Sequence, residues 1–351
     1  SLQVDVVVPA GARHGGEESG PLRRAAKSTA ASRAEIAAAA KFPSRLALRK
    51  KQMADPSAGP SAASPQLVEI ASYAPSLLVA RAGLPSPLTT PEAQALHAAV
   101  MFADVSGFTR LTESLAEAAL GSSKARVDGA EQLTRIINRY FQRMIDVIRR
   151  HGGDVVKFAG DAMLVLFRCE KARLREAGLA ASACALALQA ECGEYTATPT
   201  VTLRLHIGVG AGALCVFLVG GARDRWEVVA AGQPITQVGA AEGSAEPGDV
   251  VLSKELSILL RDDTKCFRLR DGLMKLRTIS TPAPPLAPPP PTPLADSMSR
   301  TLQLFLPGAV REQLVGGGAG LRYLSELRRV STLFINVRLP DEAKAAKATP
   351  Q

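Results

Sequence analysis

Hydrophobic residues in the middle of the chain fall into blocks that alternate between strand-like and helix-like spacing. Continuous apolar runs of about five residues predict buried strands, and apolar residues that recur every three or four positions predict amphipathic helices. The predicted elements, in chain order, are a strand at 99–103, a helix from Phe108, a polar insertion at 121–128, a helix from Ala130 that ends at Gly152-Gly153, strands at 154–158 and 163–167, a helix at 171–192, strands at 201–209, 213–219 and 226–230, a helix at 233–242, a strand at 250–252 and a helix at 253–260.

This order of elements is typical of an α+β fold. The strands at 154–158 and 163–167 are separated by four residues, so they predict a hairpin with Asp161 in its tight turn. Hairpins and short connections favour a mainly antiparallel sheet. We therefore predict a sandwich of one such sheet with helices packed on one of its faces.

The regions outside residues 98–280 have a different composition and suggest a division of the chain into further segments. Residues 1–66 are rich in Ala, Ser and basic residues and predict a disordered tail. Residues 67–97 predict a lead-in with one short helix. Residues 281–296 contain eight prolines up to Pro293 and predict a stiff linker. Residues 297–351 predict a helical linker and then a strand at 332–337.

That last strand repeats the first strand of the predicted domain. Thr332–Val337 aligns with Val100–Val105, with Asn336 where the first copy has Asp104. A repeat of this kind suggests a second, similar domain whose opening strand lies near the end of the sequence. Chance similarity between two apolar strands is the alternative.

Composition and charge exclude several classes of protein. The net charge of +9 comes largely from residues 1–60, which hold ten Lys/Arg against five Asp/Glu, and no basic face interleaved with aromatic residues indicates nucleic-acid binding. The five cysteines are scattered, which is typical of reduced thiols in a cytoplasmic protein. No apolar run is long enough to predict a membrane span.

Two aspartates are the strongest candidates for chemistry. Asp104 follows a buried strand directly, and Asp161 lies in the hairpin turn. Either alone has a structural explanation, since Asp is a common helix cap and a common turn residue. Next to Asp104, however, the segment Ser106–Thr109 forms a small turn at a helix N-terminus, which is a site that favours phosphate oxygens. Two converging carboxylates beside such a turn predict a pair of divalent cations bound to a nucleoside triphosphate.

The motifs around these aspartates resemble those of the class III nucleotidyl cyclases, and in particular the first catalytic domain of the soluble, bicarbonate-stimulated adenylyl cyclases. The resemblance extends over residues 68–338 and includes Ile70–Val79 and Tyr323–Arg328. The motifs that carry it are Phe102-x-Asp104-x-Ser106-Gly107-Phe108, Gly152-Gly153-Asp154 and Lys157-Phe-Ala-Gly-Asp161. It implies a ferredoxin-like (palm) sandwich and the conversion of ATP to cyclic AMP and pyrophosphate.

The resemblance also implies roles for individual residues. Asp104 and Asp161 would be catalytic and, with the Val105 carbonyl, would bind two Mg²⁺ or Mn²⁺ ions. Ser106, Gly107, Phe108, Thr109 and Gly160 would contact the phosphates of the nucleotide. Lys157 matches a lysine of the bicarbonate pocket, although it is equally explained as a strand lysine that pairs with Asp104 or Asp161. The arginine of that pocket is replaced by Gly239, which weakens the expectation of bicarbonate activation.

In this family a complementary domain supplies an asparagine and an arginine that stabilise the transition state. The corresponding positions here are Thr236 and Ala240. We therefore expect two copies of this chain to lack a working site, and activity to require a second cyclase domain in the same or another chain. The alternatives are a non-catalytic scaffold or nucleotide sensor and a guanylyl cyclase, because the residues that read the base lie outside this domain. The expected location is the cytoplasm, and by analogy with the soluble adenylyl cyclases a cilium or flagellum is a further expectation.

Two weaker signals have simple explanations. Gly208-Val-Gly210-Ala-Gly212 has the spacing of a phosphate loop but no helix directly after it, so close packing of the backbone is the better interpretation. His206, the one histidine in an apolar strand, is interpreted as a structural residue.

Overall fold

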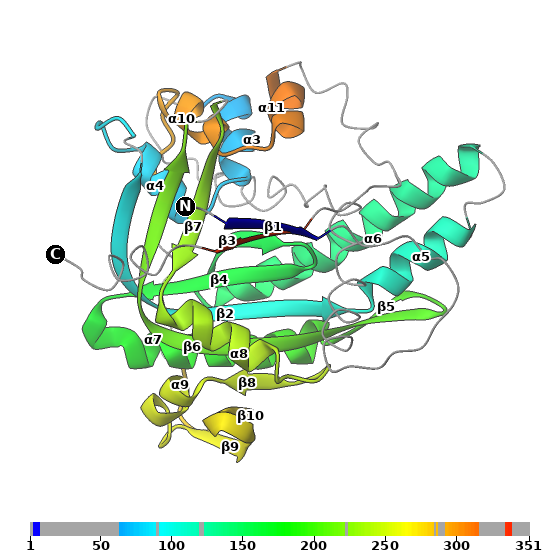
Figure 1. Ribbon diagram of the computed structural model, residues 1–351. Helices are drawn as coiled ribbons and strands as arrows, with labels where there is room; N and C mark the ends of the chain where they lie inside the picture. Colours follow the sequence, from blue (N-terminus) through cyan, green and yellow to red (C-terminus); the bar gives the residue numbers. More distant parts are fainter. Residues whose placement is uncertain are drawn as a thin grey trace.

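The computed structural model describes residues 3–7, 63–88, 91–118, 123–221, 224–283, 286, 292–315 and 334–338 (Figure 1). Most of the described residues belong to one α+β unit built around a nine-stranded sheet, as the sequence predicts. The sheet has the strand order β3-β4-β2-β6-β8-β10-β9, and β5 and β7 pair with opposite ends of the long strand β6. Its strands are β2 (Glu92–Ser106), β3 (Asp154–Ala159), β4 (Ala162–Cys169), β5 (Glu194–Thr198), β6 (Val201–Gly220), β7 (Trp226–Ala231), β8 (Val250–Leu252), β9 (Thr264–Arg268) and β10 (Met274–Ile279).

The sheet is mainly antiparallel, and only β6 and β8 pair in parallel. At its centre, β2 pairs with β6 over fifteen consecutive positions, from Glu92 opposite Leu218 to Ser106 opposite Arg204. Side chains alternate between the two faces of a strand, so this register decides which residues of β2 and β6 share a face. Ala98, Val100, Phe102 and Asp104 share one face, and Ala99, Met101, Ala103 and Val105 share the other.

Three helices cover the face that carries Met101 and Val105, and their apolar stripes form the larger hydrophobic core with it. They are α5 (Phe108–Ala118), α6 (Ser123–Arg150) and α7 (Leu174–Cys192), the last preceded by a single 3₁₀ turn at Lys171–Arg173. The predicted stripe on α6 is confirmed, since the side chains from Leu133 to Ile148 on that stripe are almost all buried. Burial of these residues fixes α6 against β3 and β4.

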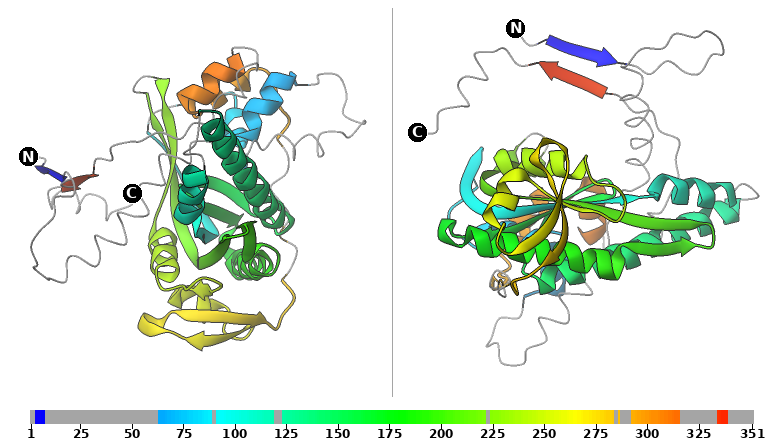
Figure 2. Two further views of the ribbon diagram at one scale, coloured as in Figure 1. Left: turned by 90° about the vertical axis from the view of Figure 1, so that its right-hand side faces the viewer. Right: turned by 90° about the horizontal axis from the view of Figure 1, so that it is seen from below.

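The opposite face is also covered, which corrects the expectation of helices on one side only. A second hydrophobic core joins Val100 and Val216 of the sheet to four further helices. These are α3 (Pro65–Ser72), α4 (Ser76–Ala82), α10 (Met298–Leu304) and α8 (Gln233–Glu242). Seen from below, α8 and α7 lie on opposite sides of the sheet (Figure 2). Two further small helices among the described residues are α9 (Lys254–Leu259) and α11 (Gly308–Val315).

Gly208 and Gly210 let α8 approach the sheet closely. A Cβ added at Gly208 would lie 2.6 Å from the Val238 carbonyl oxygen and from the Glu242 amide nitrogen, and one at Gly210 would lie 2.7 Å from the Gln237 side chain. These distances are shorter than van der Waals contact, so only glycine fits here. The interpretation of Gly208–Gly212 as close backbone packing is confirmed.

Asp154, part of the Gly-Gly-Asp motif, has a structural role. Its buried carboxylate accepts hydrogen bonds from the Ser76 amide at 3.0 Å, the Ser76 hydroxyl at 2.6 Å and the Leu77 amide at 3.3 Å. The carboxylate therefore caps the N-terminus of α4 and ties the lead-in helices to β3.

Several predicted boundaries are wrong. Strand β2 begins at Glu92, seven residues before the predicted start, and β6 is one continuous strand where two were predicted. Helix α6 begins at Ser123 within the predicted insertion, and β5, β9 and β10 were not predicted at all. The hairpin at Asp161 and the helix at 233–242 are confirmed.

Most of the predicted tail, and residues 316–333 and 339–351, lie outside the described residues. Near the two ends of the chain the structure describes two short strands, β1 (Gln3–Val7) and β11 (Phe334–Arg338), which pair antiparallel. The predicted strand at 332–337 thus overlaps β11, and Asn336 lies opposite Asp5. No helix in the described parts of the chain is long and apolar enough to cross a membrane.

Candidate active site

Asp104 lies near the C-terminal end of β2, in the centre of the sheet. Its Cα partner across the β2–β6 pair is His206. Because directly opposed residues of an antiparallel pair point to the same face, Asp104 and His206 both project to the face that carries α8. Asp104 is 25% exposed, so its carboxylate is open to solvent on one side.

Asp161 lies in the turn between β3 and β4, at the same end of the sheet as Asp104. The hairpin pairs Ala159 with Ala162, which leaves Gly160 and Asp161 as the two turn residues. Gly160 has φ +67°, as the first position of a type II′ turn requires. On the other side of β4, the pairing with β2 ends at Met163 opposite Ala103. The register therefore brings Asp104, on β2, and Asp161, in the β3–β4 turn, to the same end of the sheet; that they share an ion stays a prediction.

The predicted phosphate-binding turn is present between β2 and α5. Gly107 has φ +96°, a conformation that favours glycine, and a Cβ there would lie 3.0 Å from the Thr202 carbonyl oxygen. Helix α5 begins immediately afterwards at Phe108, whose ring is buried in the core and anchors the turn. The N-terminus of α5 thus lies directly after Asp104, although binding of a nucleotide by Ser106–Thr109 stays a prediction.

Two residues of this site were missed or misinterpreted from the sequence. His206 Nε2 lies 3.1 Å from Asp104 Oδ2 and 3.0 Å from Glu242 Oε1, and its Nδ1 lies 3.1 Å from the Ser106 hydroxyl. Hydrogen bonds to Asp104 and to Glu242 raise the pKa of His206 to about 9, against a smaller opposing effect of burial. His206 is therefore a cation at neutral pH and contacts a predicted metal ligand, rather than serving only as a structural residue of the strand.

A family model of the adenylate and guanylate cyclase catalytic domain matches residues 91–278. The chain belongs to this family. The matched segment runs from the start of β2 to the end of β10, so it contains both aspartates, the turn before α5 and the whole of α8.

Curated relatives of this cyclase domain include adenylate cyclase type 10 of two mammals. The rat protein is 30% identical over 53% of this chain and 11% of its own length, and the human protein is 26% identical over 81% of this chain and 19% of its own length. This chain therefore spans less than one fifth of the relatives that it matches. Among solved structures, the adenylyl cyclase CyaB from P. aeruginosa is 21% identical, with a TM-score of 0.43, over 53% of this chain and 96% of that one.

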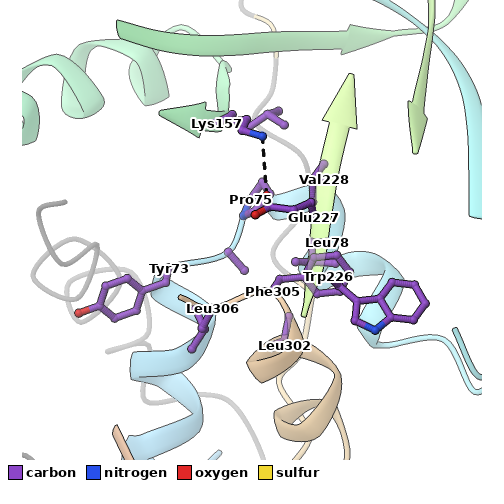
Figure 3. A pocket seen from close by; sticks show the side chains of 12 residues that line it. Tyr73, Pro75, Leu78, Lys157, Trp226, Glu227, Val228, Leu302, Phe305 and Leu306 are labelled. Atoms are coloured by element: carbon purple, nitrogen blue, oxygen red, sulfur yellow. Dashed lines mark ion pairs between the residues drawn. The ribbon is translucent and has the colours of Figure 1, made fainter. Parts of the chain in front are cut away.

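Lys157 of this cyclase domain does not contact either aspartate. Its Nζ lies 3.7 Å from Glu227 Oε2 on β7, and both side chains are about half exposed. Figure 3 shows this ion pair at the edge of a cavity of about 100 Å³ that is lined mainly by apolar side chains, among them Tyr73, Trp226 and Phe305. The suggested pairing of Lys157 with Asp104 or Asp161 is therefore wrong.

The exposed side of α8 offers no cation to this region. Thr236, Gly239 and Ala240 are all exposed, and a Cβ added at Gly239 would meet no atom within 4 Å. Gly239, which is predicted to replace the arginine of an anion pocket, thus leaves open space on this side of α8. An anion in the cavity beside Lys157 would also meet the carboxylate of Glu227, which disfavours anion binding.

The oxygen atoms around Asp104 are suitable ligands for a divalent cation. Carboxylate oxygens are the ligands that hard ions such as Mg²⁺ prefer. His206 engages Oδ2 of Asp104, and Oδ1 has no hydrogen-bond or ion-pair partner among the described residues. Asp104 therefore retains an oxygen that can bind a cation while its other oxygen is held by the imidazole.

Proposed function

We propose that this domain is one half of an adenylyl cyclase that converts ATP to 3′,5′-cyclic AMP and pyrophosphate. The observation that supports the proposal best is the placement of Asp104 on β2 and of Asp161 in the β3–β4 turn at the same end of the sheet, in a chain of the cyclase family.

In this proposal Asp104, Asp161 and the Val105 carbonyl hold two Mg²⁺ or Mn²⁺ ions. When bound, such ions favour ionisation of the ribose 3′-hydroxyl and neutralise the triphosphate. Gly107, Phe108 and Thr109 orient phosphate oxygens through their backbone N–H groups, and Gly160 allows the phosphates to approach the β3–β4 turn. The contribution of this half-site is positioning and charge neutralisation rather than a covalent intermediate.

The complementary half of the site comes from a second cyclase domain. Helix α8 carries Thr236 and Ala240 where the family's transition-state asparagine and arginine are expected. A dimer of two copies of this chain would therefore have metal ligands in both sites and the stabilising groups in neither. The proposal includes a cytoplasmic location for this assembly.

The test is production of cyclic nucleotide by this chain alone and with a complementary domain that carries the asparagine and arginine. ATP and GTP are supplied in parallel, and an Asp161→Asn variant serves as the matched control. We expect cyclic AMP only from the pair, and a loss of at least about 100-fold in rate with Asp161→Asn. A rate that is the same for Asp161→Asn as for wild type would contradict the proposal. Formation of cyclic GMP from GTP would show that the domain belongs to a guanylyl cyclase.

One observation favours a second candidate, a non-catalytic cyclase-like scaffold. Asp104 Oδ2 already has a partner in His206 Nε2, at 3.1 Å, which competes with a metal ion for that oxygen. Under this alternative the complementary pair binds nucleotide without turnover, so absence of any product from a pair that binds ATP would support it.

The Lys157–Glu227 ion pair leads to a prediction about regulation. Bicarbonate added to the same assay should change the rate by less than about twofold. The pocket offers the anion no arginine side chain, and it places the carboxylate of Glu227 beside Lys157. Strong stimulation that is lost in Lys157→Ala would show that the pocket binds the anion in another way.

A further inference from the structure

Three side chains from three different elements converge at the end of the sheet that carries the proposed catalytic residues. They are Asp104 of β2, His206 of β6 and Glu242, the last residue of α8. One ligand atom of each lies within 4.8 Å of the other two. The individual contacts from His206 Nε2 are 3.1 Å to Asp104 and 3.0 Å to Glu242, which are close to the separations between neighbouring ligands of a tetrahedral zinc ion, about 3.3 Å for bonds of about 2.0 Å.

The imidazole alone does not satisfy both carboxylates well. Nε2 carries at most one hydrogen, yet two carboxylate oxygens lie about 3 Å from it. In the part of the chain that the structure describes, no lysine or arginine lies within ion-pair distance of either carboxylate. A dication at the point where the three atoms converge would be bound by all of them at once and would balance both negative charges.

The other side of the imidazole is already fixed. Nδ1 lies 3.1 Å from the Ser106 hydroxyl, which can accept its hydrogen and leave Nε2 free as a ligand. Histidines that bind metals commonly donate their second N–H to a neighbouring oxygen in this way. When Nε2 gives up its proton to a metal ion, the Ser106 hydroxyl can thus hold the tautomer that metal binding requires.

The backbone holds Glu242 in place for this contact. Gly208 lies two residues after His206 on the same face of β6, and the amide of Glu242 comes so close that a Cβ at Gly208 would lie 2.6 Å from it. The three side chains are 13–25% exposed, so one side of the cluster is accessible to an entering ion and to a water molecule as fourth ligand.

We propose that Asp104, His206 and Glu242 form a zinc site, and that zinc bound there occupies Asp104 and inhibits the cyclase. Two oxygens and an imidazole nitrogen suit Zn²⁺ better than Mg²⁺, which prefers oxygen ligands only. Binding of zinc stands on the geometry alone, whereas inhibition rests on the proposed function.

Zinc binding is measured by calorimetric titration of the metal-free chain with ZnCl₂. Wild type should bind one equivalent that His206→Gln and Glu242→Gln both lose, and Ser106→Ala should bind it about 10–100-fold more weakly. The control variant His97→Gln keeps the cluster and should bind zinc as wild type does. The cysteines are unchanged in every variant, so zinc bound by thiols cancels in the comparison.

Equal zinc binding by wild type and Glu242→Gln would overturn the site and leave the cluster as an ion pair. Glu242 lies at the end of a surface helix, so this variant should fold even if His206→Gln does not, and circular dichroism checks both. In the cyclase assay, micromolar zinc should inhibit wild type more than Glu242→Gln, each relative to its zinc-free rate. Equal inhibition would overturn the inhibitory role, whereas absence of any cyclase activity would refute the proposed function and leave the binding result standing.

Discussion

His206 links the charge of the candidate site to the stability of the domain. Its pKa of about 9 in the folded chain exceeds the value of about 6.5 for an unperturbed histidine. A pKa that folding raises stabilises the native state below pH 6.5, and that contribution disappears as the pH rises through about 9. The protonated ring should therefore contribute at most about 3 kcal/mol at pH 6 and almost nothing at pH 10.

The measurement is urea unfolding of wild type and His206→Gln in the presence of a chelator, at pH 6 and pH 10. The gap between their free energies of unfolding should shrink by about 2–3 kcal/mol at the higher pH. His97→Gln, outside the cluster, controls for the loss of a histidine. A gap that is the same at both pH values would mean that His206 is neutral in the folded chain.

At the scale of residues, the sequence predicted Asp104, Asp161 and the Gly107 turn because each lies in a local pattern, a strand end, a hairpin or a helix start. It did not predict the partnership of Asp104 with His206 and Glu242. That partnership depends on which strands pair and in which register, and residues 104 and 206 lie far apart in the sequence. Alternation within one strand carries no such information.

The contact between α8 and β6 is the element-scale feature on which the site depends. Gly208→Ala would place a methyl group 2.6 Å from backbone atoms of α8, which cannot rotate away. We expect a loss of about 1–3 kcal/mol in the free energy of unfolding, as for other overpacked sites. Helix α8 should also move outward and carry Glu242 away from His206.

Gly239→Ala, on the exposed side of the same helix, is the matched control. Its methyl group meets no neighbour and replaces glycine in a helix interior, so it should stabilise by up to about 1 kcal/mol. Thermal melts of the two variants give the comparison. Gly208→Ala with the melting temperature of wild type would contradict the close packing described here.

At the scale of elements, helices with a clear apolar stripe were predicted well, and α8 was predicted at its observed bounds. The strands were predicted less well. The glycines at 208–212 were interpreted as a break between two strands, whereas they lie within β6 because α8 packs over them. Strands β5 and β9 lie at edges of the sheet, and together with β10 they carry mostly exposed or half-buried residues, so their apolar signal is weak.

The whole molecule includes segments on both sides of the predicted catalytic domain. Helices α3 and α4 precede it and α10 follows the proline-rich stretch, yet they share one core, in which Leu302 is fully buried. Leu302→Ala should therefore lower the free energy of unfolding by about 2–5 kcal/mol. The exposed neighbour Arg300 provides the control, since Arg300→Ala should change it by less than about 0.5 kcal/mol.

Equilibrium unfolding followed by circular dichroism and by Trp226 fluorescence checks this prediction. Trp226 packs against Phe305, just after α10, so its emission reports on that contact. Coincident transitions would show that α10 unfolds with the sheet. A separate, early fluorescence change in wild type would show that α10 is an independent segment, as the predicted domain boundary near residue 280 implies.

The sequence did not reveal this packing because prolines between residues 281 and 293 suggest the end of a domain. Within this stretch the structure describes residues 281–283, 286, 292 and 293. Leu286 within it is buried, and its carbonyl lies so close to Gly152 that a side chain at 152 would not fit.

The central claim is that Asp104 and Asp161 bind the same pair of divalent cations. The most direct measurement is anomalous diffraction at the manganese edge from crystals grown with Mn²⁺ and a non-hydrolysable ATP analogue. We predict anomalous peaks in contact with both carboxylates, next to the triphosphate at the start of α5. Carboxylates directed to opposite faces of the sheet, or manganese bound to neither, would contradict the account.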